Sequence, residues 1–297
     1  MKTPIKSMLQ TLRGKVNCTF WSLVGECKNG HQYAKELLCG REWCPECGKK
    51  NSKAHRRRYS RWLPKVQQIN VLGYLIITFP PKLREKFRDP KILRDFDRYV
   101  KRLLKREGYS RGFMRWHFFG NKPRVYHPHL NILLDHGFMR KADLKRLKHL
   151  IKTHLNIKVQ DIKYQYDVNP GKKFHLLKYV TRATFLDLDW DCELAMRLYN
   201  FRNMISWGSW KDEPVWEVSR EDKEFCDLEQ GICPICGEEI EWFGGVVRTR
   251  ELTNEGFRQC LTSPGFWKRR KMKAPLSNWV GDGKVVLWDR VAIEIPF

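Results

Sequence analysis

The sequence predicts an α+β fold, an antiparallel sheet with helices on one face, flanked by small metal-binding modules. Residues 71–185 alternate between strand and helix patterns, and ten cysteines fall mostly into two groups on either side of them. We therefore expect an N-terminal zinc-binding module with a basic helix (1–66), a central core (67–190) and a C-terminal region with a second, zinc-ribbon-like module (191–297).

The elements of the core follow the order strand, helix, strand, strand, helix, strand, helix. Val71–Phe79 is an apolar run stopped by two prolines, as in a buried strand, and the next segment has apolar residues at helical spacing. The expected elements are a strand at 71–79, a helix at 90–108, strands at 112–120 and 124–134, a helix at 141–155, a strand at 157–168 and a helix at 171–185. A split βαβ arrangement of the ferredoxin-like kind satisfies this order.

The charge balance points to a polyanionic partner. Lys and Arg number 57 against 33 Asp and Glu, so the formal net charge is +24. Nucleic acid is the usual partner of so basic a chain, whereas a surface of ion-pair networks needs both signs of charge. No signal-peptide-like or membrane-spanning run is evident, which predicts a cytoplasmic protein without membrane contact whose cysteines bind metal.

Both cysteine groups contain a two-residue spacing that aims two thiolates at one ion. The expected zinc ligands are Cys27, Cys39, Cys44 and Cys47 in the first site, and Cys226, Cys233, Cys236 and Cys260 in the second. Cys18 and His31 are spare candidates for the first site. Both sets are closed, so about two structural zinc ions are expected per chain.

A basic stretch with interleaved aromatic residues, KKNSKAHRRRYSRW, begins at Lys49, just after the Cys44–Cys47 pair. Such a stretch suits contact with phosphates and stacking on bases, although a solvated helix face gives the same pattern. We expect Arg56, Arg57 and Arg58 to contact DNA.

The stretch RVYHPHLNILL places His127, His129 and Asn131 at alternate positions of a strand, so their side chains share one face. Imidazole nitrogens with an amide oxygen suit a divalent cation that keeps open coordination positions. Such an ion can polarise a phosphodiester. On the later helix, Tyr179 shares a face with His175 and Arg182 and is a candidate nucleophile.

The pair YHPHLNILL and LKYVTRATF, in that order, resembles the HUH endonuclease superfamily. That superfamily includes rolling-circle replication initiators (Rep proteins) of plasmids and phages and single-strand transposases. YLIITFP is similar to its first motif, and CGREWCPEC resembles the zinc module of some members. The resemblance covers residues 27–185.

The resemblance implies that Tyr179 attacks a scissile phosphate of single-stranded DNA at a replication origin, giving a 5′-phosphotyrosyl link. It implies a catalytic Mg²⁺ or Mn²⁺, electrostatic support from Arg182 where relatives often carry lysine, and DNA contact by Lys178. Host helicase and polymerase would be partners, in the cytoplasm of a bacterial or archaeal cell. Two-tyrosine relatives carry a second tyrosine where this chain has Ala183, so a single catalytic tyrosine is expected.

The ligand set stays open, because Asn131 replaces the last histidine of the family's usual motif. The pair is either His129 with Asn131 or His127 with His129. His117 is a third candidate, since pairing of Phe119 with Val125 would place it opposite His127. The alternatives are a rolling-circle transposase and a non-catalytic, zinc-dependent DNA-binding protein.

Overall fold

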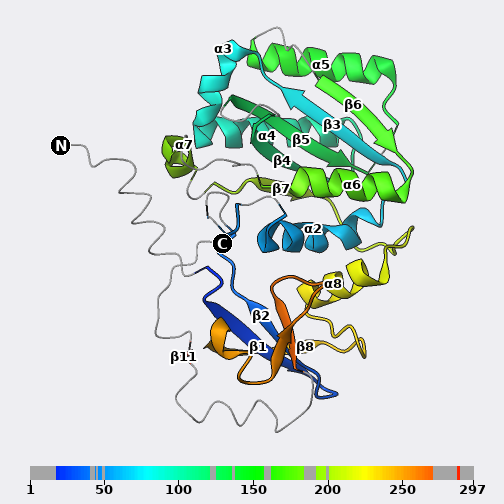
Figure 1. Cartoon of the computed structure of the whole chain (residues 1–297). Coiled ribbons are helices and arrows are strands. Elements are labelled where there is room, and N and C mark those ends of the chain that lie inside the picture. The colour runs from blue at the N-terminus through cyan, green and yellow to red at the C-terminus, as the bar shows by residue number, and fades with distance from the viewer. Residues whose placement is uncertain are drawn as a thin grey trace, which may run out of the picture. The chain divides into compact units, whose positions relative to one another are not determined.

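The computed structural model describes residues 18–40, 44, 46–48, 51–120, 125–135, 138–156, 162–183, 192–198, 201–269 and 286–287. The chain is a mixed α+β protein with two antiparallel sheets, which belong to two compact units (Figure 1). The first unit comprises residues 1–47, 51–61 and 218–297, and the second comprises residues 48–50 and 62–217. Among the described residues, no helix is long and apolar enough to cross a membrane.

The first unit is built on a six-stranded sheet of order β11-β8-β1-β2-β10-β9. Its strands are β1 (Trp21–Cys27), β2 (Gln32–Glu36), β8 (Ile240–Arg248), β9 (Phe257–Gln259), β10 (Phe266–Arg269) and β11 (Val286–Leu287). The two sides of β1 bond to β2 and β8, so one sheet joins the two ends of the chain. The prediction of separate N-terminal and C-terminal modules is therefore wrong, because sequence distance hid this strand pairing.

In the first unit, α8 (Arg220–Gln230) and the start of α2 (Lys53–Val66) are joined through a buried ion-pair cluster. The unit also contains the 3₁₀ helix η2 (Thr249–Glu251). Glu229 on α8 is buried, and its carboxylate binds Arg57 and Arg61 of α2 at 2.7 Å each. Neighbouring cations hold the pKa of Glu229 below its usual range, against the opposing effect of burial.

The second unit contains a five-stranded sheet of order β6-β3-β5-β4-β7, antiparallel throughout. Its strands are β3 (Leu72–Thr78), β4 (Gly112–Phe119), β5 (Tyr126–Leu134), β6 (Ile162–Asp167) and β7 (Met204–Trp207). Its helices are α3 (Pro81–Arg84), η1 (Glu85–Arg88), α4 (Pro90–Arg106), α5 (Lys141–Leu155), α6 (Pro170–Thr181) and α7 (Cys192–Arg197). Each strand and helix expected in the core has a counterpart here.

Helices lie on both faces of this sheet, not on one face as predicted (Figure 1). Trp116 on β4 donates its indole N–H to Asp97 of α4 at 2.8 Å, while the next residue, His117, contacts the Val180 carbonyl of α6 at 3.0 Å. Successive strand residues point to opposite faces, so α4 and α6 cover opposite faces. Tyr99 of α4 bonds to α5, which places α5 on the α4 side.

Local capping explains where α4 and α6 begin. Asp89 accepts a hydrogen bond from the Lys91 backbone N–H at the start of α4, and Asn169 accepts one from Lys172 at the start of α6. Each helix has proline at its first position, where no intrahelical N–H bond is lost. The side-chain cap and the proline together set the first residue of each helix.

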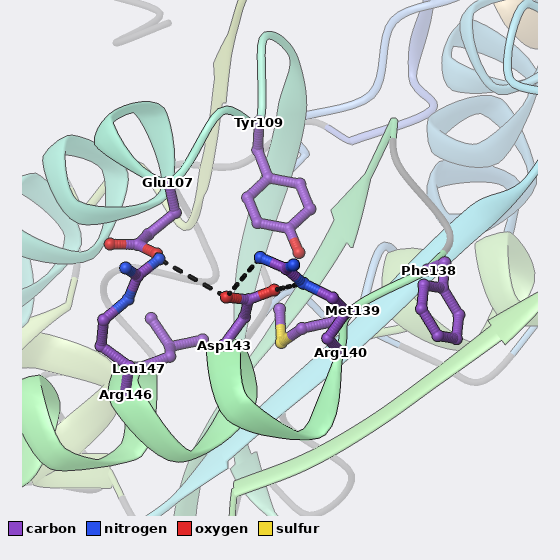
Figure 2. A pocket seen from close by; sticks show the side chains of 8 residues that line it. All are labelled: Glu107, Tyr109, Phe138, Met139, Arg140, Asp143, Arg146 and Leu147. Carbon is purple, nitrogen blue, oxygen red and sulfur yellow. Dashed lines mark hydrogen bonds and ion pairs between the residues drawn. The ribbon is translucent and has the colours of Figure 1, made fainter.

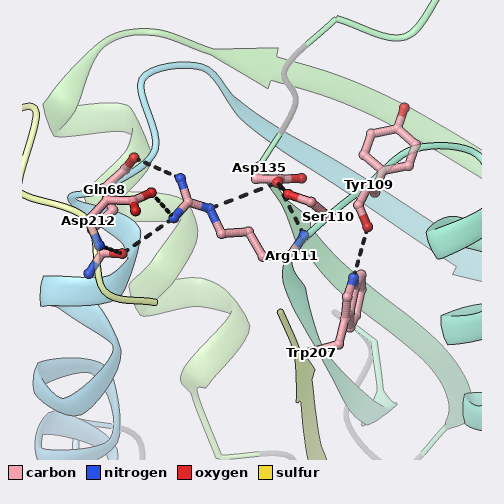
Figure 3. Close-up of polar contacts among 7 residues, drawn as sticks. All are labelled: Gln68, Tyr109, Ser110, Arg111, Asp135, Trp207 and Asp212. Atoms are coloured by element: carbon pink, nitrogen blue, oxygen red, sulfur yellow. Dashed lines mark hydrogen bonds and ion pairs between the residues drawn. The ribbon is translucent and has the colours of Figure 1, made fainter. Parts of the chain in front are cut away.

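Arg111 joins the start of β4 to the segment after β7 (Figure 3). Its guanidinium donates to Asp212 at 2.5 Å and to the Gln68 side chain at 3.4 Å, while its backbone N–H donates to Asp135. Gly208 has φ +85°, and a Cβ there would lie 2.4 Å from the Arg111 Cβ. This close approach requires glycine at position 208.

We predict that Asp97 makes stability depend on pH. Burial raises its pKa to about 7, so the native carboxyl stays protonated where the unfolded one is ionised. Unfolding then releases a proton, and stability falls as pH rises from about 4 to about 7. Relative to Asp97→Asn, the wild type should lose roughly 2 kcal/mol of unfolding free energy between about pH 5.5 and 7.5 in urea titrations.

The exposed Asp95 on the same helix provides the control, because Asp95→Asn removes a carboxylate that is open to water. Its stability curve should run parallel to that of the wild type. Parallel curves for Asp97→Asn and the wild type would contradict the proposed titration.

Candidate metal centres and candidate active site

The first cysteine cluster lies where the ends of the β1–β2 hairpin meet. It consists of Cys18, Cys39, Cys44 and Cys47, whose sulfur atoms all lie within 4.8 Å of one another. Cys47 Sγ is 3.3 Å from Cys18 Sγ and 3.6 Å from Cys39 Sγ. Four thiolates bound to zinc at about 2.3 Å are roughly 3.8 Å apart, so this set fits a tetrahedral ion.

The second cluster lies at the other end of β1. It consists of Cys27, His31, Cys233 and Cys236, again with all ligand atoms within 4.8 Å. Cys27 Sγ is 3.6 Å from Cys236 Sγ and 3.4 Å from His31 Nδ1. Gly30 and Gly237, with φ of 74° and 75°, close the two turns that aim these ligands inward.

The electrostatics of the second cluster differ from ligand to ligand. A backbone hydrogen bond from Glu238 lowers the pKa of Cys236 to about 6, and burial raises the pKa of Cys27 to about 11. The hydroxyl of the buried Tyr33 lies 3.3 Å from Cys233 Sγ. A metal ion would bind the thiolate forms, and its binding would release the remaining thiol protons.

The grouping of ligands differs from the predicted grouping. Cys27 belongs to the second cluster, while Cys18 and His31, the two spare candidates, complete the first and second clusters. Cys226 and Cys260 lie outside both. The reason is the pairing of β1 with β8, which sets Cys27 opposite Ile240, close in sequence to Cys233 and Cys236. The glycine in CKNGH is the signal that could have revealed Cys27 and His31 as a knuckle of their own.

The basic stretch on α2 is less available to DNA than expected. Arg57 is buried and donates to Glu229 at 2.7 Å and to the Glu36 carbonyl at 2.7 Å, so its predicted role in DNA contact is wrong. Arg56 is partly buried and donates to the Thr262 carbonyl at 3.3 Å. Arg58 is also partly buried.

The histidine row lies on the face of the second sheet that α6 covers. His127, His129 and Asn131 alternate along β5, and His117 on β4 is the direct partner of His129. A register shift after His117 pairs Phe119 with Tyr126, so the predicted pairing of Phe119 with Val125 is wrong. His117 nevertheless shares the face, with its ring centroid 5.2 Å from that of His129.

Tyr179 on α6 packs against this row. Its ring centroid is 5.4 Å from that of His117 and 6.4 Å from that of Tyr74. Arg182 places an Nη2 atom 3.5 Å from the Tyr179 hydroxyl and its guanidinium carbon 4.3 Å from the ring centroid. The helix therefore brings the candidate nucleophile and a cation to the imidazoles, whereas His175, on the same helix, is exposed.

Burial keeps the central imidazoles neutral. It lowers the pKa of His129 to about 4 and holds the pKa of His117 well below its usual range. His129 Nδ1 bonds to the His127 carbonyl at 2.9 Å, and His117 Nε2 to the Val180 carbonyl. A carbonyl oxygen only accepts hydrogen bonds, so His129 Nδ1 and His117 Nε2 carry the protons. The other ring nitrogens, His129 Nε2 and His117 Nδ1, therefore keep lone pairs that can bind a ligand.

The amide of Asn131 is held by a tyrosine on the neighbouring strand. Asn131 is fully buried, and its Oδ1 accepts a hydrogen bond of 2.6 Å from the Tyr74 hydroxyl. Its Nδ2 has no hydrogen-bond partner among the described residues. Tyr74 was not among the predicted site residues, although it begins the YLIITFP stretch and lies on the same strand face as Thr78, the partner of His129.

The histidine row is more open than the cysteine clusters. In the described part of the chain, the ligand atoms of the three histidines do not all lie within 4.8 Å of one another. Any cation there would therefore bind fewer protein ligands at once and keep positions for substrate oxygens. The chemistry of the donors fits Mg²⁺ or Mn²⁺ less fully than the cysteine clusters fit a zinc-like ion.

A separate pocket of about 190 Å³ lies at the start of α5 (Figure 2). Its two arginines are both engaged: Arg140 bonds to Asp143 at 2.8 Å, and Arg146 bonds to Glu107. Two cations and two carboxylates balance each other, so this pocket offers no excess charge to a phosphate.

A scan of protein-family models finds no match to this chain, and neither the curated proteins nor the solved structures give one. The functional assignment therefore depends on the geometry of the sites described above.

We predict that the metal ions are bound by the ligand sets of the two clusters and not by the sets that cysteine spacing alone suggests. Cys18→Ser should reduce bound metal from about two ions per chain to about one, because it removes one of four ligands from a closed site. Metal content of the purified protein, measured by mass spectrometry, tests this directly.

Cys226→Ser is the matched control, since Cys226 lies outside both clusters and should leave both ions bound. Loss of one ion from Cys226→Ser, with retention of both by Cys18→Ser, would contradict the observed grouping.

Proposed function

We propose that this protein is a metal-dependent enzyme that nicks and rejoins single-stranded DNA to initiate rolling-circle replication, as HUH endonucleases do. The observation that carries the proposal is the packing of Tyr179 against His117, with Arg182 beside the Tyr179 hydroxyl and His129 beside His117. A phenol, a guanidinium and neutral imidazoles on one sheet face are the groups that a tyrosine-based phosphoryl transfer needs.

The topology of the second unit supports a ferredoxin-like core. Its first four strands in chain order are β3, β4, β5 and β6, and their order in the sheet is β6-β3-β5-β4. The split βαβ unit has this fourth-first-third-second order, with all neighbours antiparallel. In this assignment β7 is an additional edge strand, and α6 is the helix that carries the nucleophile.

In the proposed reaction, the Tyr179 oxygen attacks the scissile phosphorus and the bond to the 3′ oxygen breaks. The phenol loses its proton, the departing 3′ oxygen gains one, and the 5′ phosphate stays on Tyr179. Attack by a 3′ hydroxyl on this phosphotyrosine reverses the step and rejoins the strand. Arg182 would stabilise the negative charge that develops on the phosphate.

A divalent cation, Mg²⁺ or Mn²⁺, would neutralise and orient the scissile phosphate. The residues that would hold it are His129 and His117 through their unprotonated nitrogens, with His127 beside them. Asn131 is a weaker candidate, because Tyr74 occupies its amide oxygen. Lys178 Nζ lies 3.9 Å from the centroid of the Phe174 ring on α6. We propose that Lys178 contacts the DNA backbone.

The substrate in this proposal is single-stranded DNA at a replication origin, with host helicase and polymerase acting on the nicked strand. The cysteine clusters would hold structural zinc. A rolling-circle transposase would use the same chemistry on transposon ends. The other candidate is a zinc-dependent DNA-binding protein that does not cleave, and it is favoured by the poorer fit of the histidine row to Mg²⁺ or Mn²⁺ than of the cysteine clusters to a zinc-like ion.

We predict that Tyr179→Phe abolishes covalent attachment and nicking. The change removes one oxygen and keeps the ring contacts with His117 and Tyr74, so folding and DNA binding should persist. Activity on labelled single strands in Mn²⁺ should fall by at least about 10⁴-fold, because no other group replaces the nucleophile. Tyr164→Phe and Tyr166→Phe are matched controls that should still form the adduct.

Peptide mapping of the wild-type adduct should place the nucleotide on the peptide that contains Tyr179. An adduct on another tyrosine, or normal cleavage by Tyr179→Phe, would overturn the mechanism. Binding without any cleavage by the wild type would favour the non-catalytic candidate.

We predict that His129→Ala lowers metal-dependent nicking by about 100-fold or more, since it removes the central lone pair of the row. Affinity for single strands should change little, because phosphate contacts elsewhere dominate it. Titration of nicking with Mn²⁺ separates the candidates for the second ligand: His117→Ala should shift the metal dependence more than Asn131→Ala. Unchanged metal dependence in His129→Ala would exclude this ligand set.

A further inference from the structure

A pocket of about 440 Å³ lies in the first unit, beside the Cys18 cluster. Its walls combine two aromatic side chains, two cations, a buried carboxylate and an amide. The residues that matter here are Phe20, Glu36, Lys53, Arg250, Gln259 and Trp267. A pocket of this size holds a small organic ligand such as one nucleotide.

The indole that lines the pocket is fixed in orientation. Trp267 donates its N–H to Glu36 Oε1 at 3.0 Å, and Lys53 Nζ donates to both oxygens of the same carboxylate at 2.8 and 2.7 Å. Glu36 itself is buried. A planar ring held in this way can stack on a planar ligand without losing further side-chain entropy.

The second aromatic wall is open to solvent. Phe20 is 43% exposed, with Trp21 edge-on at 5.1 Å between ring centroids and the Arg248 guanidinium 5.9 Å from its ring centroid. Large apolar side chains at such exposure are common singly, but this one shares a pocket with Trp267. Two aromatic walls in one pocket favour a flat ligand.

The charges of the pocket favour an anion on the same ligand. Lys53 and Arg250 contribute two positive charges against the single negative charge of Glu36. Bidentate binding to Glu36 leaves Lys53 one further donor, and Gln259 offers both a donor and an acceptor to a base edge. The formal net charge of +24 on the whole chain also attracts a polyanion at long range.

We propose that this pocket binds one unpaired nucleotide of a single-stranded nucleic acid, the base stacking on Phe20 and Trp267 and the phosphate facing Lys53 and Arg250. A paired base is stacked on its neighbours and cannot present its face to these rings, so a duplex is excluded. Because this site involves no cleavage, it does not depend on the proposed reaction of Tyr179. Cys18 lines the pocket as a cluster ligand, so metal bound there would hold the Phe20 wall in place.

The test measures binding of fluorescent dT and U octamers to the full-length, metal-loaded protein by anisotropy. Phe20→Ala should weaken binding roughly 5- to 100-fold by removing one stacking surface. Arg250→Gln should reduce the dependence of log affinity on log salt by about 0.7, the loss of one phosphate contact to a single strand. The dT and U arms distinguish DNA from RNA as the source of the nucleotide.

Two exposed residues of the same unit outside the pocket provide controls. Leu261, which is 93% exposed, and Arg258 on β9 do not line the pocket, so Leu261→Ala and Arg258→Gln should bind with affinity close to that of the wild type. Photocrosslinking with an iodouracil-containing octamer should label the peptide with Phe20 or Trp267. Wild-type affinity in both Phe20→Ala and Trp267→Ala, or crosslinks only elsewhere, would overturn the proposal.

The binding experiment can reject the nucleotide pocket without rejecting the proposed nicking reaction, and the reverse also holds. Failure of both Phe20→Ala and Trp267→Ala to weaken binding, with an intact Tyr179 adduct, would reject this pocket alone. Weakened binding without any adduct in the wild type would reject the nicking reaction and retain the pocket.

Discussion

The second unit depends on a central strand, β5, whose two faces are both buried. One face carries Leu130 and Ile132 toward the α4 side of the sheet, and the other carries His129 and Asn131 toward α6. Strand geometry enforces this division, because a shift of one residue would exchange the two sets. The same apolar residues that anchor β5 in the core therefore hold the histidine row in a fixed position opposite α6.

In the first unit, β1 has the corresponding role through its two ends. Cys18 precedes the strand and Cys27 ends it, and each belongs to a different cysteine cluster. Bound metal at both ends would fix the strand and, through its pairing with β2 and β8, most of the sheet. Small sheets bury little apolar surface, so ligand clusters of this kind add stability that packing alone supplies poorly.

The sequence predicted local elements well and long-range partners poorly. Apolar periodicity located β3 to β6 and the helices α4 to α6, because burial of one face requires it, whereas the short α3 and η1 and the edge strand β7 were not predicted. Periodicity could not predict that Cys27 and Cys233 belong to one cluster, because their grouping depends on which strand pairs with the second side of β1. The same limit applies to Arg57, where a basic helix face gave no sign of the buried Glu229 partner. His117 lies on the expected face, but a register shift in the hairpin determined its partner.

The polar face under α6 is costly for a purely structural core. His117 Nδ1 and Asn131 Nδ2 are buried without hydrogen-bond partners among the described residues. Each such atom costs about 1–3 kcal/mol relative to an apolar replacement of similar shape. Leucine or valine at these strand positions would pack against α6 without that cost. Tyr179 and Arg182 add a phenol and a cation to the same face, where aliphatic side chains would also suffice for packing. The free-energy cost of these buried polar groups favours a ligand-binding role for this face of the sheet, independently of any family resemblance.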